Sequence, residues 1–157
     1  LVKEDSNWWM IDSGSVTTGA VAATDVSLTD TAAIFAATNV ETALLEASKV
    51  VTKSTAANYT IGTTNSRELY GGVIYVTAAA TITIPAVADG ASFTVITVGA
   101  VAVSVDPNAA DLIYLDGTAL SDGDKITNTS TAGDIAVLTY YDGTGWYAAT
   151  NGWTDGN

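Results

Sequence analysis

The stretch that decides the fold reads Phe93-Thr94-Val95-Ile96-Thr97-Val98, then Gly99-Ala100, then Val101-Ala102-Val103-Ser104-Val105. Valine, isoleucine, threonine and phenylalanine dominate it, and these residues favour β-strands. Neither half carries a charge, and the glycine between them is typical of a turn. The stretch therefore predicts two neighbouring strands of a β-rich domain.

Similar short runs recur through residues 58–157, separated by Asp-Gly turn signals at 89–90, 116–117, 122–123 and 142–143. Asp-Gly favours tight hairpins because both residues tolerate positive φ. Seven or eight short strands at this spacing predict a mainly β fold, a sandwich or jelly-roll-like domain. No period of 20 to 50 residues repeats convincingly, so a solenoid is not expected.

The uncharged strands raise the question of what covers their edges. Exposed strand edges promote association between chains, and lysine or proline are the usual means of blocking them. The chain has 5 Lys and Arg residues together and 2 Pro. Burial of faces and edges between subunits is therefore expected.

A helix is predicted over residues 38–53. It opens on Thr38-Asn39-Val40-Glu41, which fits a capping box, and its apolar residues fall on one stripe. The stripe consists of Val40, Leu44, Ala47 and Val51. An isolated helix of this length is marginal in water, so the stripe must pack either on its own β-domain or on copies in a trimeric bundle.

Residues 1–37 form a segment rich in small and polar residues, expected to lie extended on another surface. Its one dense apolar cluster is Trp8-Trp9-Met10-Ile11. Tryptophan is enriched at the energetic centres of interfaces. The cluster is interpreted as an anchor, with packing against the helix or a neighbouring subunit as the alternative.

Composition excludes several classes of protein. The net charge of −12 disfavours nucleic acid and anionic membranes as partners. The absence of His and Cys removes the usual triads, thiolate metal sites and disulfides. Residues 69–88 are free of charges after Glu68, but their glycines, threonines and proline indicate strands rather than a membrane helix.

Two groups of side chains are candidates for binding. Among the aromatic residues, Trp153, Trp146 and Tyr147 are candidates for glycan contact, with a core or interface role as the alternative. Aspartates at 106, 111, 116, 122 and 124 could supply calcium ligands, but their spacing does not fit an EF-hand and most sit at expected turns. We expect no metal site, no cofactor and no enzymatic activity.

Two segments have a recognisable pattern. The first is Asp30-Thr31-Ala32-Ala33-Ile34-Phe35-Ala36-Ala37-Thr38-Asn39-Val40-Glu41-Thr42-Ala43-Leu44-Leu45-Glu46. The second combines Val105-Asp106-Pro107, Asp111-Leu112-Ile113-Tyr114-Leu115, Gly117, Gly123 and Tyr141-Asp142-Gly143-Thr144-Gly145-Trp146-Tyr147. The first resembles a linker and helix of the virion fibre proteins of tailed bacteriophages, and the second resembles their β-modules.

The resemblance implies a homotrimeric structural component on the virion surface, with the major capsid protein or another virion component as partner. The chain is short for a tail fibre, which favours a capsid decoration protein or short head fibre. A tail-fibre-type module that binds host surface glycans is the alternative. A self-polymerising extracellular surface protein is a second alternative.

Overall fold

The computed structural model describes residues 2–4, 7–9, 40–87, 90–109, 111–141 and 143–157. The chain is mainly β, as predicted, with 46% of residues in strands and two mixed sheets. One sheet has seven strands in the order β10-β9-β13-β12-β7-β5-β3. The other has five strands in the order β14-β11-β8-β6-β4.

The elements follow one another in this order: β1 (Val2–Glu4), β2 (Asn7–Trp9), α1 (Val40–Ala47), β3 (Thr52–Thr55), β4 (Tyr59–Thr60), the 3-10 helix η2 (Ser66–Leu69), β5 (Tyr70–Val76), β6 (Ala80–Thr83), β7 (Ser92–Thr97), β8 (Val103–Asp106), β9 (Ile113–Leu115), β10 (Thr118–Ala119), β11 (Ile126–Asn128), β12 (Ile135–Tyr141), β13 (Gly145–Asn151) and β14 (Trp153–Asp155). The predicted strands around Gly99 are β7 and β8, which lie in different sheets.

A single hydrophobic cluster receives side chains from both sheets. The seven-stranded sheet contributes residues such as Phe93 and Leu138, and the five-stranded sheet contributes residues such as Ile82 and Val105. Burial alternates along the strands, as in β7, where every second residue is buried. Each sheet therefore has one inner face, on the core, and one outer face.

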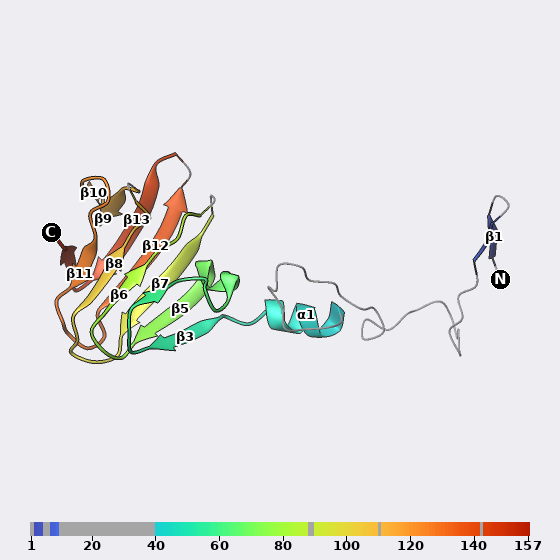
Figure 1. Ribbon diagram of the computed structural model, residues 1–157, viewed down its shortest axis with the longest axis horizontal. Coiled ribbons are helices and arrows are strands. Elements are labelled where there is room, and N and C mark those ends of the chain that lie inside the picture. The colour runs from blue at the N-terminus through green and yellow to red at the C-terminus, as the bar shows by residue number, and fades with distance from the viewer. Residues whose placement is uncertain (1, 5–6, 10–39, 88–89, 110, 142) are drawn as a thin grey trace.

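The first strands of the domain form a coil that alternates between the sheets (Figure 1). Strands β3, β5 and β7 stack in parallel, with Thr52 paired to Val73 and Val73 to Thr94. The spacing is 21 residues each time (73 − 52 and 94 − 73). Strands β4, β6 and β8 stack in parallel in the other sheet. The sequence contains no convincing repeat at this spacing, so the coil was not expected. Parallel strands pair through backbone hydrogen bonds, which do not require repeated side chains.

The second half of the domain closes one end of this stack with mostly antiparallel strands. Strand β12 pairs with β7 and β13, and β11 pairs with β8 and β14. Strand β9 returns parallel to β13. Residues 69–88 lie largely in β5 and β6, as predicted. Within the described ranges, no helix is long and apolar enough to cross a membrane.

One predicted hairpin turn is confirmed at Asp116-Gly117, which joins β9 to β10. Both residues have positive φ, 48° and 88°, as a tight two-residue hairpin turn requires. The Asp116 carboxylate accepts hydrogen bonds from the Thr150 N–H at 2.8 Å and the Thr150 hydroxyl at 2.7 Å. The side chain therefore joins the turn to β13.

The helix α1 is shorter than the predicted 38–53. It ends at Ala47, and the Ser48 hydroxyl donates to the Leu45 carbonyl at 2.7 Å. Val51 lies outside the helix, where its carbonyl accepts from the Val73 N–H at 2.9 Å. The parallel pairing of this segment with β5 therefore replaces the last predicted turn of helix. The β-domain begins at Thr52 rather than at residue 58.

The amino-terminal strands β1 and β2 form a two-stranded antiparallel hairpin. Val2 pairs with Trp9 and Lys3 with Trp8. Met10, Ile11, the capping-box residue Thr38 and most of segment 1–37 lie outside the described residues. A lone two-stranded hairpin is marginally stable in water, so this one is a poor candidate for an independent unit.

Candidate interaction surface

The outer face of the seven-stranded sheet is the most apolar exposed surface of the β-domain. Its side chains lie in cross-strand rows set by the strand register. The first row contains Ala119, Tyr114, Tyr147, Thr139, Ser92 and Tyr70. The second contains Ala149, Val137, Thr94, Val73 and Thr52, and the third contains Asn151, Ile135, Ile96, Tyr75 and Ser54. None of these residues carries a charge; we call them the outer Tyr/Val face.

Large exposed side chains concentrate on this face. Val137 is 39% exposed and Tyr147 is 45% exposed. Tyr70, Tyr75 and Tyr141 are exposed on the same sheet. Isolated exposed apolar residues are normal, whereas a contiguous group marks an interaction site. The outer Tyr/Val face is therefore the leading candidate surface.

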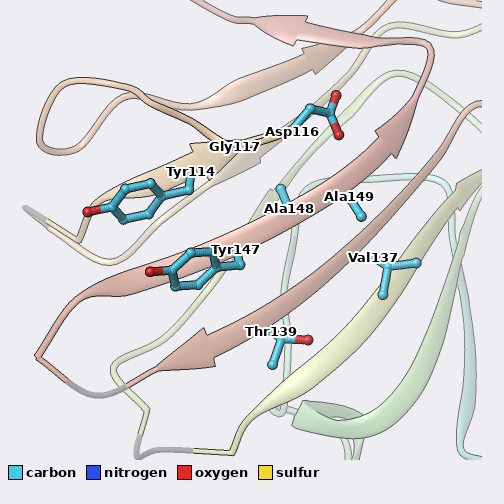
Figure 2. A pocket seen from close by; sticks show the side chains of 8 residues that line it. All are labelled: Tyr114, Asp116, Gly117, Val137, Thr139, Tyr147, Ala148 and Ala149. Atoms are coloured by element: carbon cyan, nitrogen blue, oxygen red, sulfur yellow. The ribbon is translucent and has the colours of Figure 1, made fainter.

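A pair of stacked tyrosines stands in the first row of the face. Figure 2 shows Tyr114 of β9 and Tyr147 of β13 side by side. Their ring centroids are 4.7 Å apart and the planes differ by 6°. Next to the pair lies an open depression of about 390 Å³, lined also by Val137, Thr139 and Asp116. Aromatic walls with a few polar groups suit a small neutral ligand or an inserted side chain.

The outer face of the five-stranded sheet has a different chemistry. Its outward positions are mainly hydroxyl residues: Thr60, Thr81, Thr83, Ser104, Thr127 and Thr154. The Ser104 and Thr127 hydroxyls are hydrogen-bonded at 3.0 Å. No exposed tyrosine, valine or leucine is found on the described strands of this sheet. The two outer faces therefore differ, and only one offers aromatic and aliphatic contact area.

Two of the three glycan-contact candidates are core residues. Trp146 is fully buried, with its ring centroid 5.3 Å from that of Phe93 in an edge-on arrangement. Trp153, the second of these candidates, is 6% exposed, because β14 places it on the inner face of the five-stranded sheet. Their indole N–H groups are buried without a hydrogen-bond partner. Only Tyr147 of the three is accessible, and its neighbour Tyr114 was not predicted.

The sequence contained one signal for Tyr114. Ile113-Tyr114-Leu115 places an aromatic residue between two apolar ones, which in a short strand points it to the opposite face. Its stacking on Tyr147 depends on the parallel pairing of β9 with β13. That pairing joins residues far apart in the chain and left no local pattern.

The predicted trimer-contact residues have mixed surroundings. Leu44 is 66% exposed and Ala47 is exposed, whereas Val40 and Val51 are half-buried. Leu45 is 60% exposed. Helix α1 extends from the β3 side of the domain and covers neither sheet (Figure 1). Its exposed leucines therefore have no partner on the described β-domain.

The coil ends at β3, an edge strand of the seven-stranded sheet. An inward-facing charge on this strand disfavours pairing with another chain. Lys53 of the edge strand β3 pairs with the buried Ile74, so its side chain projects toward the core side. The ammonium lies 4.7 Å from the ring centroid of Tyr59, whose hydroxyl donates to Glu68 at 2.6 Å. Inward-pointing charges are one way that natural sheets prevent edge-to-edge growth.

Two of the five candidate aspartates, Asp116 and Asp124, accept hydrogen bonds from neighbouring protein groups. Asp116 binds Thr150, and Asp124 accepts from the Ser121 N–H at 3.1 Å and from the Asn157 side chain. Among the described residues, no three acidic side chains come together as metal ligands would. The candidates for calcium ligands are therefore not brought together in this part of the chain.

The chain was compared with known families, curated proteins and solved structures. None of the three comparisons finds a match.

Proposed function

We propose that this protein is a non-enzymatic structural component of a bacteriophage virion, a homotrimeric capsid decoration protein or short head fibre on the particle surface. In this proposal the two sheets form a β-sandwich that projects outward. Helix α1 associates with its copies, and the amino-terminal segment with Trp8 and Trp9 docks on the major capsid protein or another virion component. The resemblance to phage fibres supplies the virion assignment.

The observation that carries the proposal is the exposure of Leu44 and Leu45 on a short helix outside the β-domain. Burying a leucine side chain contributes about 1.5–3 kcal/mol, whereas an isolated helix of eight residues is not stable in water. Packing of three copies around these residues supplies both the burial and the stability.

The oligomeric part of the proposal is tested by the mass of the purified chain in sedimentation equilibrium. A trimer is expected for the wild type, and Leu44→Asp is expected to shift the equilibrium toward monomer by at least tenfold in association constant. Ala56→Asp adds the same charge at an exposed loop position and serves as the control. A wild-type chain that stays monomeric would contradict the trimer.

The virion part is tested by binding to capsids. Trp8→Ala and Trp9→Ala together are expected to reduce occupancy on purified particles, while Ala56→Asp leaves it unchanged. Saturation at a copy number set by capsid symmetry supports decoration. Unchanged occupancy of the double variant would remove the anchoring role of the tryptophans.

A glycan-binding module remains the second candidate because of one observation. The exposed Tyr147 and the half-buried Tyr114 form a stacked pair beside a mainly apolar depression that also has Thr139 and Asp116 in its lining. In this alternative, Tyr147→Ala abolishes binding to a sugar array. Substitution of the buried Trp153 lowers sugar binding only by destabilising the fold. A trimer without sugar binding favours the decoration protein.

A further inference from the structure

We propose that the outer Tyr/Val face is a second contact surface between copies of this chain, through which the β-domains pack on one another beside the helices. The inference rests on the proposed self-association but not on the virion role. The occupant of the face is a second copy of the chain.

The charge of the outer Tyr/Val face favours a second copy as its occupant. The chain carries a net charge of −12, so two copies repel each other wherever their carboxylates face. The three rows of the outer Tyr/Val face contain no acidic or basic residue. The carboxylate of Asp116, which lines the depression beside these rows, accepts two hydrogen bonds from Thr150. Contact through the three rows therefore brings copies together with few opposing like charges.

The residue composition of the outer Tyr/Val face also suits an interface. The exposed residues Tyr75, Val137 and Tyr147 are of the kinds that form the apolar centre of interfaces, with threonines between them. The outer face of the five-stranded sheet consists mainly of hydroxyl residues and includes Asp106. Water forms hydrogen bonds with exposed hydroxyl groups at little cost in free energy. Of the two outer faces, the outer Tyr/Val face is therefore the one whose burial lowers the free energy.

The area of the outer Tyr/Val face is comparable with that of an interface. Five strands at a spacing of about 4.8 Å and about six residues of length give a face of roughly 500 Å². A stable interface uses about 800 Å² on each partner. The outer Tyr/Val face therefore supplies a large part of an interface, and the exposed leucines of α1 supply a further apolar area.

The test compares two threonines that are both exposed and both in strands. Thr139 lies in the first row of the outer Tyr/Val face, and Thr154 lies on the outer face of the other sheet. Thr139→Lys places a long charged side chain in the proposed contact, whereas Thr154→Lys changes the net charge equally outside it. Sedimentation equilibrium of the full chain is expected to show at least a tenfold weaker association for Thr139→Lys only.

A second variant keeps the test independent of folding defects. Val137→Thr preserves side-chain volume and strand propensity but removes apolar contact, and thermal unfolding monitors the fold of each variant. Threefold or greater weakening of association is expected for folded Val137→Thr. Wild-type association of both face variants overturns this inference while leaving the helix-mediated trimer intact. If the wild-type chain is a monomer, both the face contact and the helix-mediated trimer are overturned. If that monomer binds neutral sugars, the outer Tyr/Val face is assigned to glycan binding instead.

Discussion

The guanidinium of Arg67 donates hydrogen bonds to the carbonyl oxygens of Ala47 and Lys49, at 3.0 Å each. Ala47 ends helix α1, and Arg67 belongs to η2 of the β-domain. The carbonyl groups at a helix carboxyl end have no partner within the helix and carry partial negative charge. Arg67 therefore caps α1 and joins it to the β-domain through a contact across 20 residues.

Replacing Arg67 should loosen the helix while leaving the β-domain folded. Two charge-assisted hydrogen bonds at a helix end contribute about 1–2 kcal/mol, so Arg67→Met is expected to speed amide exchange in α1 about 5- to 30-fold. Lys49→Met removes one positive charge close to the same helix end and serves as the control. Equal exchange rates in the two variants would show that Arg67 does not hold the helix.

The inward charge at the open end of the coil leads to a prediction about polymerisation. Lys53→Ile should leave an uncharged edge strand next to the apolar core, and such edges pair with other chains. Concentration-dependent filaments or large particles are expected in light scattering and electron microscopy, at concentrations where the wild type remains small. Lys49→Ile, with the same loss of charge at an exposed position, should behave as wild type. A Lys53→Ile chain that sediments like the wild type argues against this protective role.

The tryptophans of the core should affect stability rather than ligand contact. Trp146 fills space between Phe93 and Tyr140, so Trp146→Ala is expected to cost about 3–5 kcal/mol in chemical unfolding. Trp153→Ala should also destabilise the chain by several kcal/mol because its side chain is buried. Tyr147→Ala, on the exposed face, should cost about 1 kcal/mol or less in monomer stability. A stable Trp153→Ala chain would contradict its place in the core.

Substitutions at Gly143 and Gly145 distinguish the cost of an unfavourable backbone conformation from the cost of a steric clash. Gly143 and Gly145 both have positive φ, 72° and 129°, but only Gly145 is tightly surrounded. A Cβ there would lie 2.4 Å from the Leu112 carbonyl oxygen, whereas one at Gly143 meets nothing within 4 Å. Gly143→Ala is expected to cost about 1–2 kcal/mol, and Gly145→Ala clearly more in urea unfolding. Equal losses would show that the approach of β9 to β13 tolerates displacement.

Local chemistry made part of the fold predictable. The strands β7 and β8 follow from their valine, isoleucine and threonine content, and the turn at Asp116-Gly117 follows from the tolerance of both residues for positive φ. The described helix Val40–Ala47 lies within the predicted amphipathic segment 38–53. The helix ends earlier than predicted, because the pairing of Val51 with β5 competes with the helix.

The candidate surface could be predicted only in part. Tyr147 was a candidate from its aromatic surroundings in sequence, but the burial of Trp146 and Trp153 depends on which side of each strand meets the core. Tyr114 became part of the surface through the parallel pairing of β9 and β13. Side-chain direction alternates along every strand, so a register that sequence does not reveal decides which aromatic residue is accessible.

The sequence by itself determined that this chain is mainly β, strongly acidic, and without histidine or cysteine. Only the tertiary structure decided that successive strands coil between two sheets at a 21-residue spacing and that one outer face gathers the exposed tyrosines and valines. The physical reason is that strand propensity is a property of neighbouring residues, whereas strand order and register arise from hydrogen bonds and packing between residues distant in the chain.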